Sequence, residues 1–301
     1  MPAAEALAHL PRRGRQFILW NQRPGKSGPM NGDEHLIEMA ASSHGSRGAG
    51  GAKSKLASAT SVDAREVSNF EAMATEWWDP DGRFRPLHRF NPVRIKYIRD
   101  HATAHFGRPI TDLSPFDGLK LLDIGTGGGL VAEPMARLGA EVTGIDPSEK
   151  NIAIAQAHVT AMGLDVTYRA TTAEHMAAQG ARFDIVLALE VVEHVANIAV
   201  FLEAAAELVK PGGIFFAATL NRTARAYALA ILGAEYVMGW LPRGTHDWNK
   251  FVTPGELTTA LEGRGLRVNT VSGLSYNPLT RAWRLGSDTG VNYIIAAEKS
   301  T

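Results

Sequence analysis

The sequence contains no cysteine, which excludes disulfide bonds, cysteine-ligated metal clusters and a thiol nucleophile. It also lacks an excess of either charge, since 31 Lys and Arg residues balance 31 Asp and Glu residues among 301 positions. With no net positive charge, the protein lacks the electrostatic attraction that would bind a polyanion, and we expect no nucleic-acid partner. No apolar run reaches the roughly 18 residues of a membrane-spanning helix, and a signal-peptide pattern is absent. We expect a soluble chain, or one that contacts membranes only peripherally.

The first part of the chain, residues 1–61, differs in composition from the rest. It is rich in small and polar residues, and Phe17 and Trp20 are its only aromatic residues. Such a segment buries too little apolar surface to fold by itself. We therefore predict a disordered N-terminal extension over residues 1–61 and one folded domain over residues 62–301. An organellar transit peptide and a later start codon are the alternatives for the extension.

After the extension, short apolar runs alternate with amphipathic stretches, which is the pattern of an α/β fold. We predict a Rossmann-like architecture, in which a seven-stranded, mostly parallel sheet carries helices on both faces. The predicted strands are Lys120–Ile124, Glu141–Ile145, Val166–Arg169, Asp184–Leu189, Ile214–Thr219, Arg267–Val271 and Asn292–Ala297. The predicted helices are Val131–Leu138, Glu149–Met162, Asn197–Val209 and Pro254–Arg264.

The first predicted strand runs directly into a glycine-rich turn that begins at Gly125 and continues through Gly127. Glycines at such a junction let the backbone approach a ligand closely. A dinucleotide fingerprint needs a glycine where this chain has Leu130, which disfavours an NAD-dependent oxidoreductase. The next strand leads to Asp146, about 20 residues past the first glycine, where a carboxylate suits ribose hydroxyls. The combination predicts a nucleoside-type cofactor rather than an ordinary turn with a surface aspartate.

The sequence segments DIGTGGG, which begins at Asp123, and GID, which ends at Asp146, resemble the first two motifs of class I S-adenosylmethionine-dependent methyltransferases. This resemblance implies a Rossmann-like class I methyltransferase fold and S-adenosylmethionine as the cofactor. It implies that Gly125 and Gly127 lie next to the methionine part of the cofactor and that Asp146 binds the ribose hydroxyls. It also implies that the segment around Ala173 faces the adenine.

A cluster of polar residues follows the fourth predicted strand. Glu190, Glu193 and His194 have the spacing of one face of a helical turn. Two carboxylates and an imidazole can bind a divalent metal or supply a general base. Alternatively, the carboxylates cap the next helix and His194 packs against the sheet. The spacing alone favours neither interpretation.

Longer stretches resemble one family within this class. Residues Phe70–Asp79, Pro86–Arg94 and Gly244–Asp247 resemble the ubiquinone biosynthesis O-methyltransferases. The resemblance implies methylation of a ring hydroxyl of 2-polyprenyl-6-hydroxyphenol and of the 3-hydroxyl of 3-demethylubiquinol. It implies cofactor contacts at Arg94, Gly125, Asp146 and Leu189, and a magnesium ion held by Glu190, Glu193 and His194.

The expected chemistry is an in-line attack of a phenolate oxygen on the sulfonium methyl group. A phenol has a pKa near 10, so deprotonation by His194, or help from a cation at Glu190 and Glu193, lowers the barrier. Arg94 is expected to pair with the cofactor carboxylate through two parallel hydrogen bonds. The alternatives are a methyltransferase of another small or lipid-like hydroxyl compound and a non-catalytic cofactor-binding module.

An apolar stretch, residues 224–241, lies inside a predicted insertion at about 221–250 and carries only two charged residues. It is a poor membrane span, so we expect a helix that lies in the interface of an anionic membrane, where the polyprenyl substrate resides. A helix packed into the core is the alternative. The expected location is cytoplasmic and peripherally membrane-associated in a bacterium, or the matrix side of the mitochondrial membrane. Association with other ubiquinone-synthesis enzymes is a further expectation.

Overall fold

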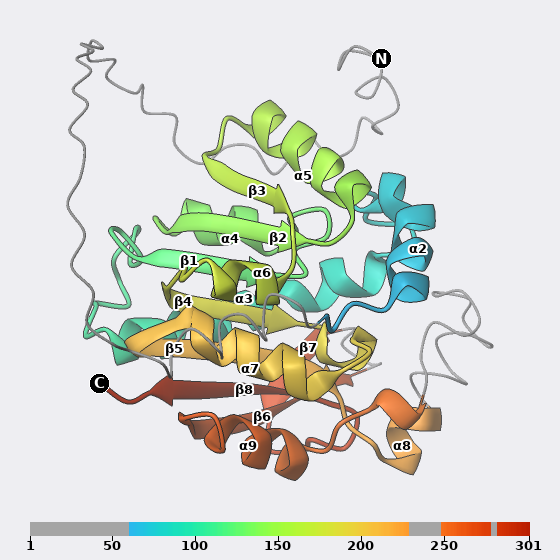
Figure 1. Ribbon diagram of the computed structural model, residues 1–301, viewed down its shortest axis with the longest axis vertical. Helices are drawn as coiled ribbons and strands as arrows, with labels where there is room; N and C mark the ends of the chain where they lie inside the picture. The colour runs from blue at the N-terminus through green and yellow to red at the C-terminus, as the bar shows by residue number, and fades with distance from the viewer. Residues whose placement is uncertain (1–59, 229–247, 278–281) are drawn as a thin grey trace, which may run out of the picture. The chain divides into compact units, whose positions relative to one another are not determined.

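The computed structural model describes residues 60–228, 248–277 and 282–301. Within these residues the chain forms an eight-stranded sheet in the order β3-β2-β1-β4-β5-β8-β6-β7, flanked by helices (Figure 1). Neighbouring strands from β3 to β5 are parallel, whereas β8 is antiparallel to β5 and β6. The strand order reverses between β1 and β4, as in doubly wound α/β folds. The predicted Rossmann-like fold is therefore confirmed.

The described residues contain one strand more than the seven predicted. The additional strand, β7, pairs with the end of β6 in an antiparallel hairpin. Its side chains are all at least partly exposed, so it lacks the apolar run that marked the other strands. The strands are β1 (Lys120–Ile124), β2 (Glu141–Asp146), β3 (Val166–Ala170), β4 (Phe183–Leu189), β5 (Val209–Leu220), β6 (Leu266–Asn277), β7 (Ala282–Gly286) and β8 (Asn292–Lys299).

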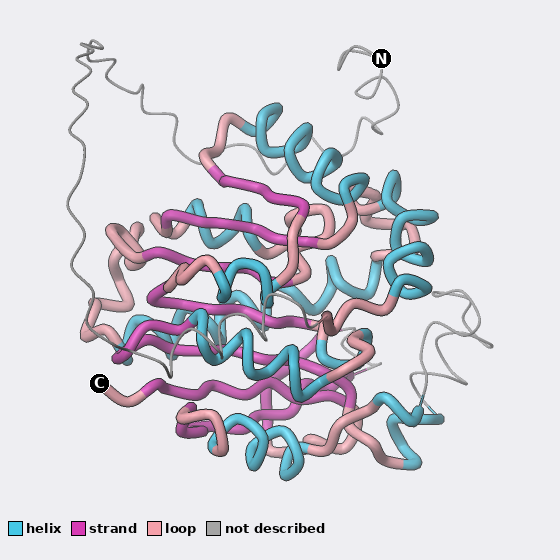
Figure 2. Tube along the Cα trace, in the orientation of Figure 1, coloured by secondary structure: helices cyan, strands magenta, loops and turns pink. Residues whose placement is uncertain are grey.

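Both faces of the sheet are buried, because successive side chains of a strand point to opposite sides. Leu122 of β1 packs in a cluster with α6, α7 and α9, whereas its neighbour Leu121 packs in a second cluster with α3, α4 and α5. Figure 2 shows the strands in the middle of the fold with helices around them. The helices are α3 (Arg85–His105), α4 (Ala132–Arg137), α5 (Glu149–Met162), α6 (Ala173–Ala178), α7 (Ile198–Leu208) and α9 (Pro254–Glu262).

An N-terminal segment lies against the glycine-rich turn after β1. It contains α2 (Ala64–Met73) and the short helix η2 (Ala74–Glu76). Trp77 follows η2 and packs with Phe84 and Leu130 in a small apolar cluster. The next residue, Trp78, donates from its indole nitrogen to the carbonyl oxygen of Gly128 at 2.9 Å. The segment therefore packs directly on the glycine-rich turn.

The predicted apolar insertion falls largely outside the described residues. Its described ends are α8 (Ala224–Ala226) and the short helix η5 (Trp248–Lys250). The prediction that residues 224–241 lie at a membrane surface therefore concerns a stretch of which only the first residues are described. Among the described helices, none has the length and apolar character needed to cross a bilayer.

Candidate active site

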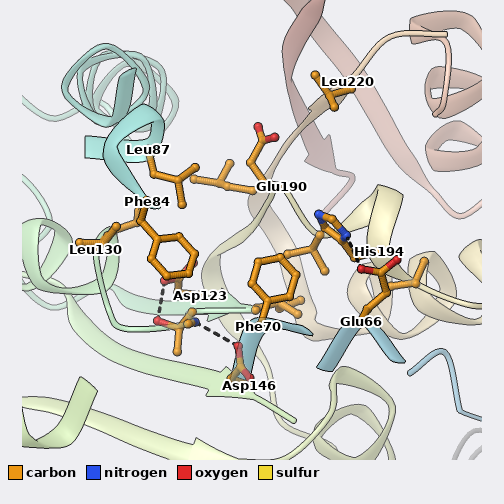
Figure 3. A pocket seen from close by; sticks show the side chains of 18 of the residues that line it. Glu66, Phe70, Phe84, Leu87, Asp123, Leu130, Asp146, Glu190, His194 and Leu220 are labelled. Atoms are coloured by element: carbon orange, nitrogen blue, oxygen red, sulfur yellow. Dashed lines mark hydrogen bonds and ion pairs between the residues drawn. The ribbon is translucent and has the colours of Figure 1, made fainter. Parts of the chain in front are cut away.

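The carboxyl ends of β1, β2, β4 and β5 lie at one edge of the sheet, because these strands are parallel. A cavity of about 600 Å³ opens at this edge. Every predicted site residue except Glu193 lines it, namely Arg94, Gly125, Gly127, Asp146, Ala173, Leu189, Glu190 and His194. Figure 3 shows Asp123 and Asp146 on one side of the cavity, and His194 with Glu66 on the other. The fold therefore brings these eight residues together around one cavity.

Two positions of the glycine turn have no room for any side chain. Gly125 and Gly127 have φ angles of 68° and 54°, in the left-handed region that favours glycine. A Cβ atom on Gly127 would lie 2.4 Å from the Trp77 ring, and one on Gly125 would lie 2.5 Å from Val191. Trp77 and Val191 therefore pack directly on the backbone of the turn, which only glycine at these positions allows.

Asp146, at the end of β2, is fixed by three hydrogen bonds. Its carboxylate accepts from the backbone N–H of Gly127 at 3.1 Å and of Ser148 at 2.9 Å, and from the Asn151 amide at 3.2 Å. Burial raises the pKa of the carboxyl, and these hydrogen bonds oppose that increase. Because the Gly127 contact joins the end of β2 to the turn after β1, Asp146 and the turn form one rigid wall.

Asp123 lies next to the same turn and is buried at the cavity wall. The Thr126 hydroxyl donates to it at 2.8 Å. Burial raises the pKa of Asp123 to about 7, and the charge of Asp146 adds to the increase, whereas Thr126 and Arg94 oppose it. Near neutral pH this carboxyl is therefore partly protonated.

Arg94 of α3, which is buried, and Glu190 after β4, which is partly exposed, form an ion pair. Arg94 Nη1 donates to Glu190 Oε1 at 3.0 Å, while Nε and Nη2 donate to Asn91. The guanidinium also stacks over the ring of Phe90 at 4.2 Å. Glu190 has a φ angle of 56°, unusual for a residue other than glycine, and its backbone N–H donates to Ala218 at 2.8 Å. Strained backbone of this kind concentrates at functional sites.

His194 is held by a carboxylate from the N-terminal segment. Its Nδ1 lies 3.2 Å from Glu66 Oε2 in α2. Lys250 donates to Glu66 at 3.0 Å and to Asp63 at 2.9 Å. Burial raises the pKa of Glu66, but the hydrogen bonds from His194 and Lys250 outweigh that increase and hold the pKa below its usual value. Glu66 is therefore an anion next to the imidazole.

Glu193 does not take the position that its proposed catalytic and metal-binding roles require. It is buried outside the cavity lining, and its Oε2 accepts from the Thr219 hydroxyl at 2.8 Å. Burial raises the pKa of Glu193 well above its usual value, and the nearby charge of Glu190 raises it further. The reason is topological, because the short helix η3 (Val192–His194) turns Glu193 toward β5.

The three predicted magnesium ligands therefore point to different partners: Glu190 to Arg94, Glu193 to Thr219 and His194 to Glu66. Among the described residues, no three His, Asp or Glu side chains are placed to share one metal ion. Glu193 is buried on the Thr219 hydroxyl and Glu190 is already paired with a guanidinium, so neither carboxyl group is placed as a ligand for a hard cation. The residues as arranged do not fit a preformed magnesium site.

Glu66 and Lys250 are functional candidates that the sequence analysis missed. Asp63 accepts from the backbone N–H of Arg65 as the N-cap of α2, and Glu66 follows three residues later. That spacing is a known signal for the start of a helix. It could have predicted α2, but no local pattern connects Glu66 with His194, because the contact depends on how α2 packs across the end of the sheet.

Comparison with known proteins places this site in a family. Residues 97–271 match the family model described as a methyltransferase domain. The ubiquinone biosynthesis O-methyltransferase of Methylobacterium nodulans is 59% identical over 239 residues, which cover 79% of this chain and 96% of that protein. The protein of the same name from Parvibaculum lavamentivorans is 54% identical over 244 residues, which cover 81% and 96%. This chain belongs to the ubiquinone biosynthesis O-methyltransferases.

Solved structures share the fold of this family member at much lower identity. A methyltransferase from Thermotoga maritima has a TM-score of 0.50 at 19% identity, covering 78% of this chain and all of that chain. An S-adenosylmethionine-dependent methyltransferase from Clostridium acetobutylicum has a TM-score of 0.50 at 10% identity, covering 69% and 91%. These likenesses concern the fold, which is the class I methyltransferase fold that the glycine turn and Asp146 indicated.

Proposed function

We propose that this chain transfers a methyl group from S-adenosylmethionine to a phenolic hydroxyl of a polyprenylated ubiquinone precursor. The observation that carries the proposal is a single cavity with a cofactor wall, made by the glycine turn and Asp146, and a His194–Glu66 pair on the other side. The names of the relatives support the substrate class. The two acceptors are 2-polyprenyl-6-hydroxyphenol and 3-demethylubiquinol.

The cofactor wall offers groups that match the parts of S-adenosylmethionine, which supplies an electrophilic methyl group when bound. Asp146 would accept hydrogen bonds from the ribose hydroxyls. Glu174, after Ala173, lines the cavity, and its buried Oε2 has no hydrogen-bond partner among the described residues, so it suits the amino group of adenine. The Arg94–Glu190 pair carries both charges needed to receive an amino-acid carboxylate and ammonium group.

His194 is the proposed general base. When Nδ1 donates to Glu66, the neutral imidazole carries its lone pair on Nε2, which is then the atom that takes the phenol proton. The Glu66 carboxylate stabilises the positive charge that develops on the ring, and Lys250 keeps that carboxylate in position. General-base catalysis of this kind typically contributes 10²–10⁴-fold in rate.

A direct assay tests the proposal. The full chain is incubated with S-adenosylmethionine and a catechol that carries a short prenyl chain, and the product is analysed by mass spectrometry. We expect a mass increase of one methyl group on a ring oxygen, and a loss of about 10²-fold or more in His194→Ala. Methylation of sterol or fatty-acid acceptors in place of the catechol would contradict the proposed acceptor class.

Magnesium at Glu190, Glu193 and His194 remains a prediction of the family resemblance alone. It requires that Arg94 release Glu190 and that Glu66 release His194. Restoration of turnover by magnesium after treatment with a chelator would support such a rearrangement. Unchanged turnover in excess chelator would leave His194 as the base without a metal.

We also propose peripheral contact with an anionic membrane through residues 224–241, and association with other enzymes of the pathway at the cytoplasmic or matrix side. The support is the composition of this stretch and the location of prenylated substrates in bilayers. We expect the full chain to float with anionic liposomes at low salt, and a variant with serine at Leu229, Ile231 and Trp240 to lose that property. Serine at the exposed Ile110 and Leu113 is the control, since it removes surface hydrophobicity elsewhere.

A further inference from the structure

Asn292, the first residue of β8, is a buried amide that the proposed mechanism does not use. Its side chain lines the cavity and is 7% exposed. Its Oδ1 is enclosed and has no hydrogen-bond partner among the described residues. An unpaired buried polar atom costs about 1–3 kcal/mol of stability. Such an atom in a native cavity is explained when a ligand supplies the missing partner.

The partners of Asn292 in the sheet are apolar. In the sheet it pairs with Leu220 of β5 on one side and with Leu274 of β6 on the other, and both leucines line the cavity. Directly paired residues share a face of the sheet. Ile294 and Ala296, which lie deeper along β8 on that face, are buried and apolar. Among these residues on one face of the sheet, Asn292 is the amide and the others are apolar.

The cavity wall at Asn292 lies near the reacting end. Glu190 donates its backbone N–H to Ala218 of β5, and β5 also pairs with β8. Strands are about 4.8 Å apart, so β4, which ends just before Glu190, and β8, which begins at Asn292, are separated by about 10 Å. That distance is about the width of a substituted aromatic ring with its hydrogen bonds. The amide is thus placed to contact an acceptor whose reacting oxygen faces the side of Glu190 and His194.

We propose that the Asn292 amide binds the acceptor hydroxyl adjacent to the one that is methylated. This inference rests on the proposed function and identifies a residue that determines its specificity. The two acceptors differ in their substituents, but both carry a hydroxyl on the ring carbon next to the reacting one. An amide can donate to and accept from such a hydroxyl. One residue therefore serves both methylation steps, and a phenol without the neighbouring hydroxyl leaves the amide unpaired.

Two acceptors and three variants test the inference. The acceptors are a catechol with a short prenyl chain and the corresponding phenol that lacks the neighbouring hydroxyl. The variants are Asn292→Leu, which keeps the branched shape of the side chain but is larger and cannot form hydrogen bonds, Asn292→Ala, in case leucine does not fit, and Leu274→Met as the control. The control changes the same wall without changing its hydrogen bonding. For each protein, kcat and KM are measured with both acceptors, together with cofactor affinity and melting temperature.

We expect Asn292→Leu to lower kcat/KM for the catechol by about tenfold, mainly through KM, with no loss for the simple phenol. Cofactor affinity should not change, and the melting temperature should stay constant or rise, because an unpaired buried amide is removed. Leu274→Met should affect both acceptors alike. An unchanged catechol-to-phenol ratio in both Asn292 variants would overturn the inference while leaving the proposed function intact. If the wild type methylates neither acceptor, the proposed function itself fails, and the inference fails with it.

Discussion

Glu66 and His194 are 128 positions apart in the sequence, yet their side chains meet at 3.2 Å. The contact makes α2 part of the active site rather than a cover for it. Phe70 of the same helix reinforces the arrangement, because its ring meets the His194 imidazole edge to face at 5.1 Å between centroids. The orientation of the proposed base therefore depends on the first helix of the described chain.

The first prediction concerns this pair. Glu66→Gln should lower kcat by about 10–100-fold at saturating cofactor, because an amide does not stabilise the imidazolium charge. Cofactor affinity should remain near that of the wild type. Glu71→Gln is the matched control, since Glu71 lies in the same helix but accepts from Ser148 instead of His194. Equal losses of kcat in the two variants would show that only the packing of α2 matters.

The second prediction concerns cofactor affinity. Asp146→Asn should weaken S-adenosylmethionine binding by about 2 kcal/mol, or roughly 30-fold, because a charge-assisted contact becomes neutral. The asparagine oxygen can replace only one of the two carboxylate oxygens, so either the Gly127 contact or the Ser148 and Asn151 contacts are lost as well, and the melting temperature is measured alongside. Calorimetry measures the change, and Asp165→Asn at an exposed position is the control. Wild-type affinity in a folded Asp146→Asn protein would remove Asp146 as the ribose anchor.

The third prediction concerns pH and stability. The pKa of Asp123 is about 7 in the folded state and about 3.9 in an unfolded chain, so the folded state binds the proton more tightly. This group therefore stabilises the fold fully below pH 4, and its contribution is lost as the pH rises toward 7. Asp123→Asn removes that loss, and the Asn side chain can still accept from Thr126.

Urea denaturation at pH 5 and pH 8 measures this effect. The free energy of unfolding of Asp123→Asn, relative to the wild type, should increase by about 2 kcal/mol between the two pH values. An identical difference at both pH values would mean that Asp123 titrates in its ordinary range. Activity is not needed for this test, so it is independent of the proposed function.

The fourth prediction places the start of the folded domain. The backbone of Ser61 donates to Glu174 at 3.0 Å and accepts from Ala196 at 2.7 Å. Deletion of residues 1–59 should therefore leave the melting temperature and turnover nearly unchanged. Deletion through Asp63 should lower both, because it removes these contacts, the N-cap of α2 and a partner of Lys250. A fall of several degrees in the shorter deletion would reveal contacts made by the first 59 residues.

Local sequence signals were sufficient for much of the fold. The predicted bounds of β1 and of α5 equal the observed ones. For α5 the cause is visible, since the Ser148 side chain accepts from the Asn151 backbone at its start, and Gly163 ends it in the left-handed conformation. α3 was missed because Pro92 lies inside it, and proline usually interrupts a helix.

The candidate site also contains residues that the sequence predicts and residues that it does not. The glycine turn and Asp146 could be predicted, because each follows a strand and the parallel order brings strand ends together. Glu193 could not be placed, because the turn at η3 rather than an α-helical repeat decides where it points. No local sequence pattern marks Asn292 as a binding residue. Its meaning depends on the absence of a partner among apolar neighbours in the sheet, which only the packed structure reveals.

The two indoles at the glycine turn have an optical consequence. Trp77 lies against Gly127 and donates to Asn151 at 3.0 Å, while Trp78 donates to Gly128 and stacks on His158 at 3.4 Å between ring centroids. A ligand that settles on this turn must change the polarity around at least one indole. The intrinsic tryptophan emission of the unlabelled protein should therefore shift on cofactor addition, which would allow the association and release steps to be followed by stopped flow before any methyl group is transferred.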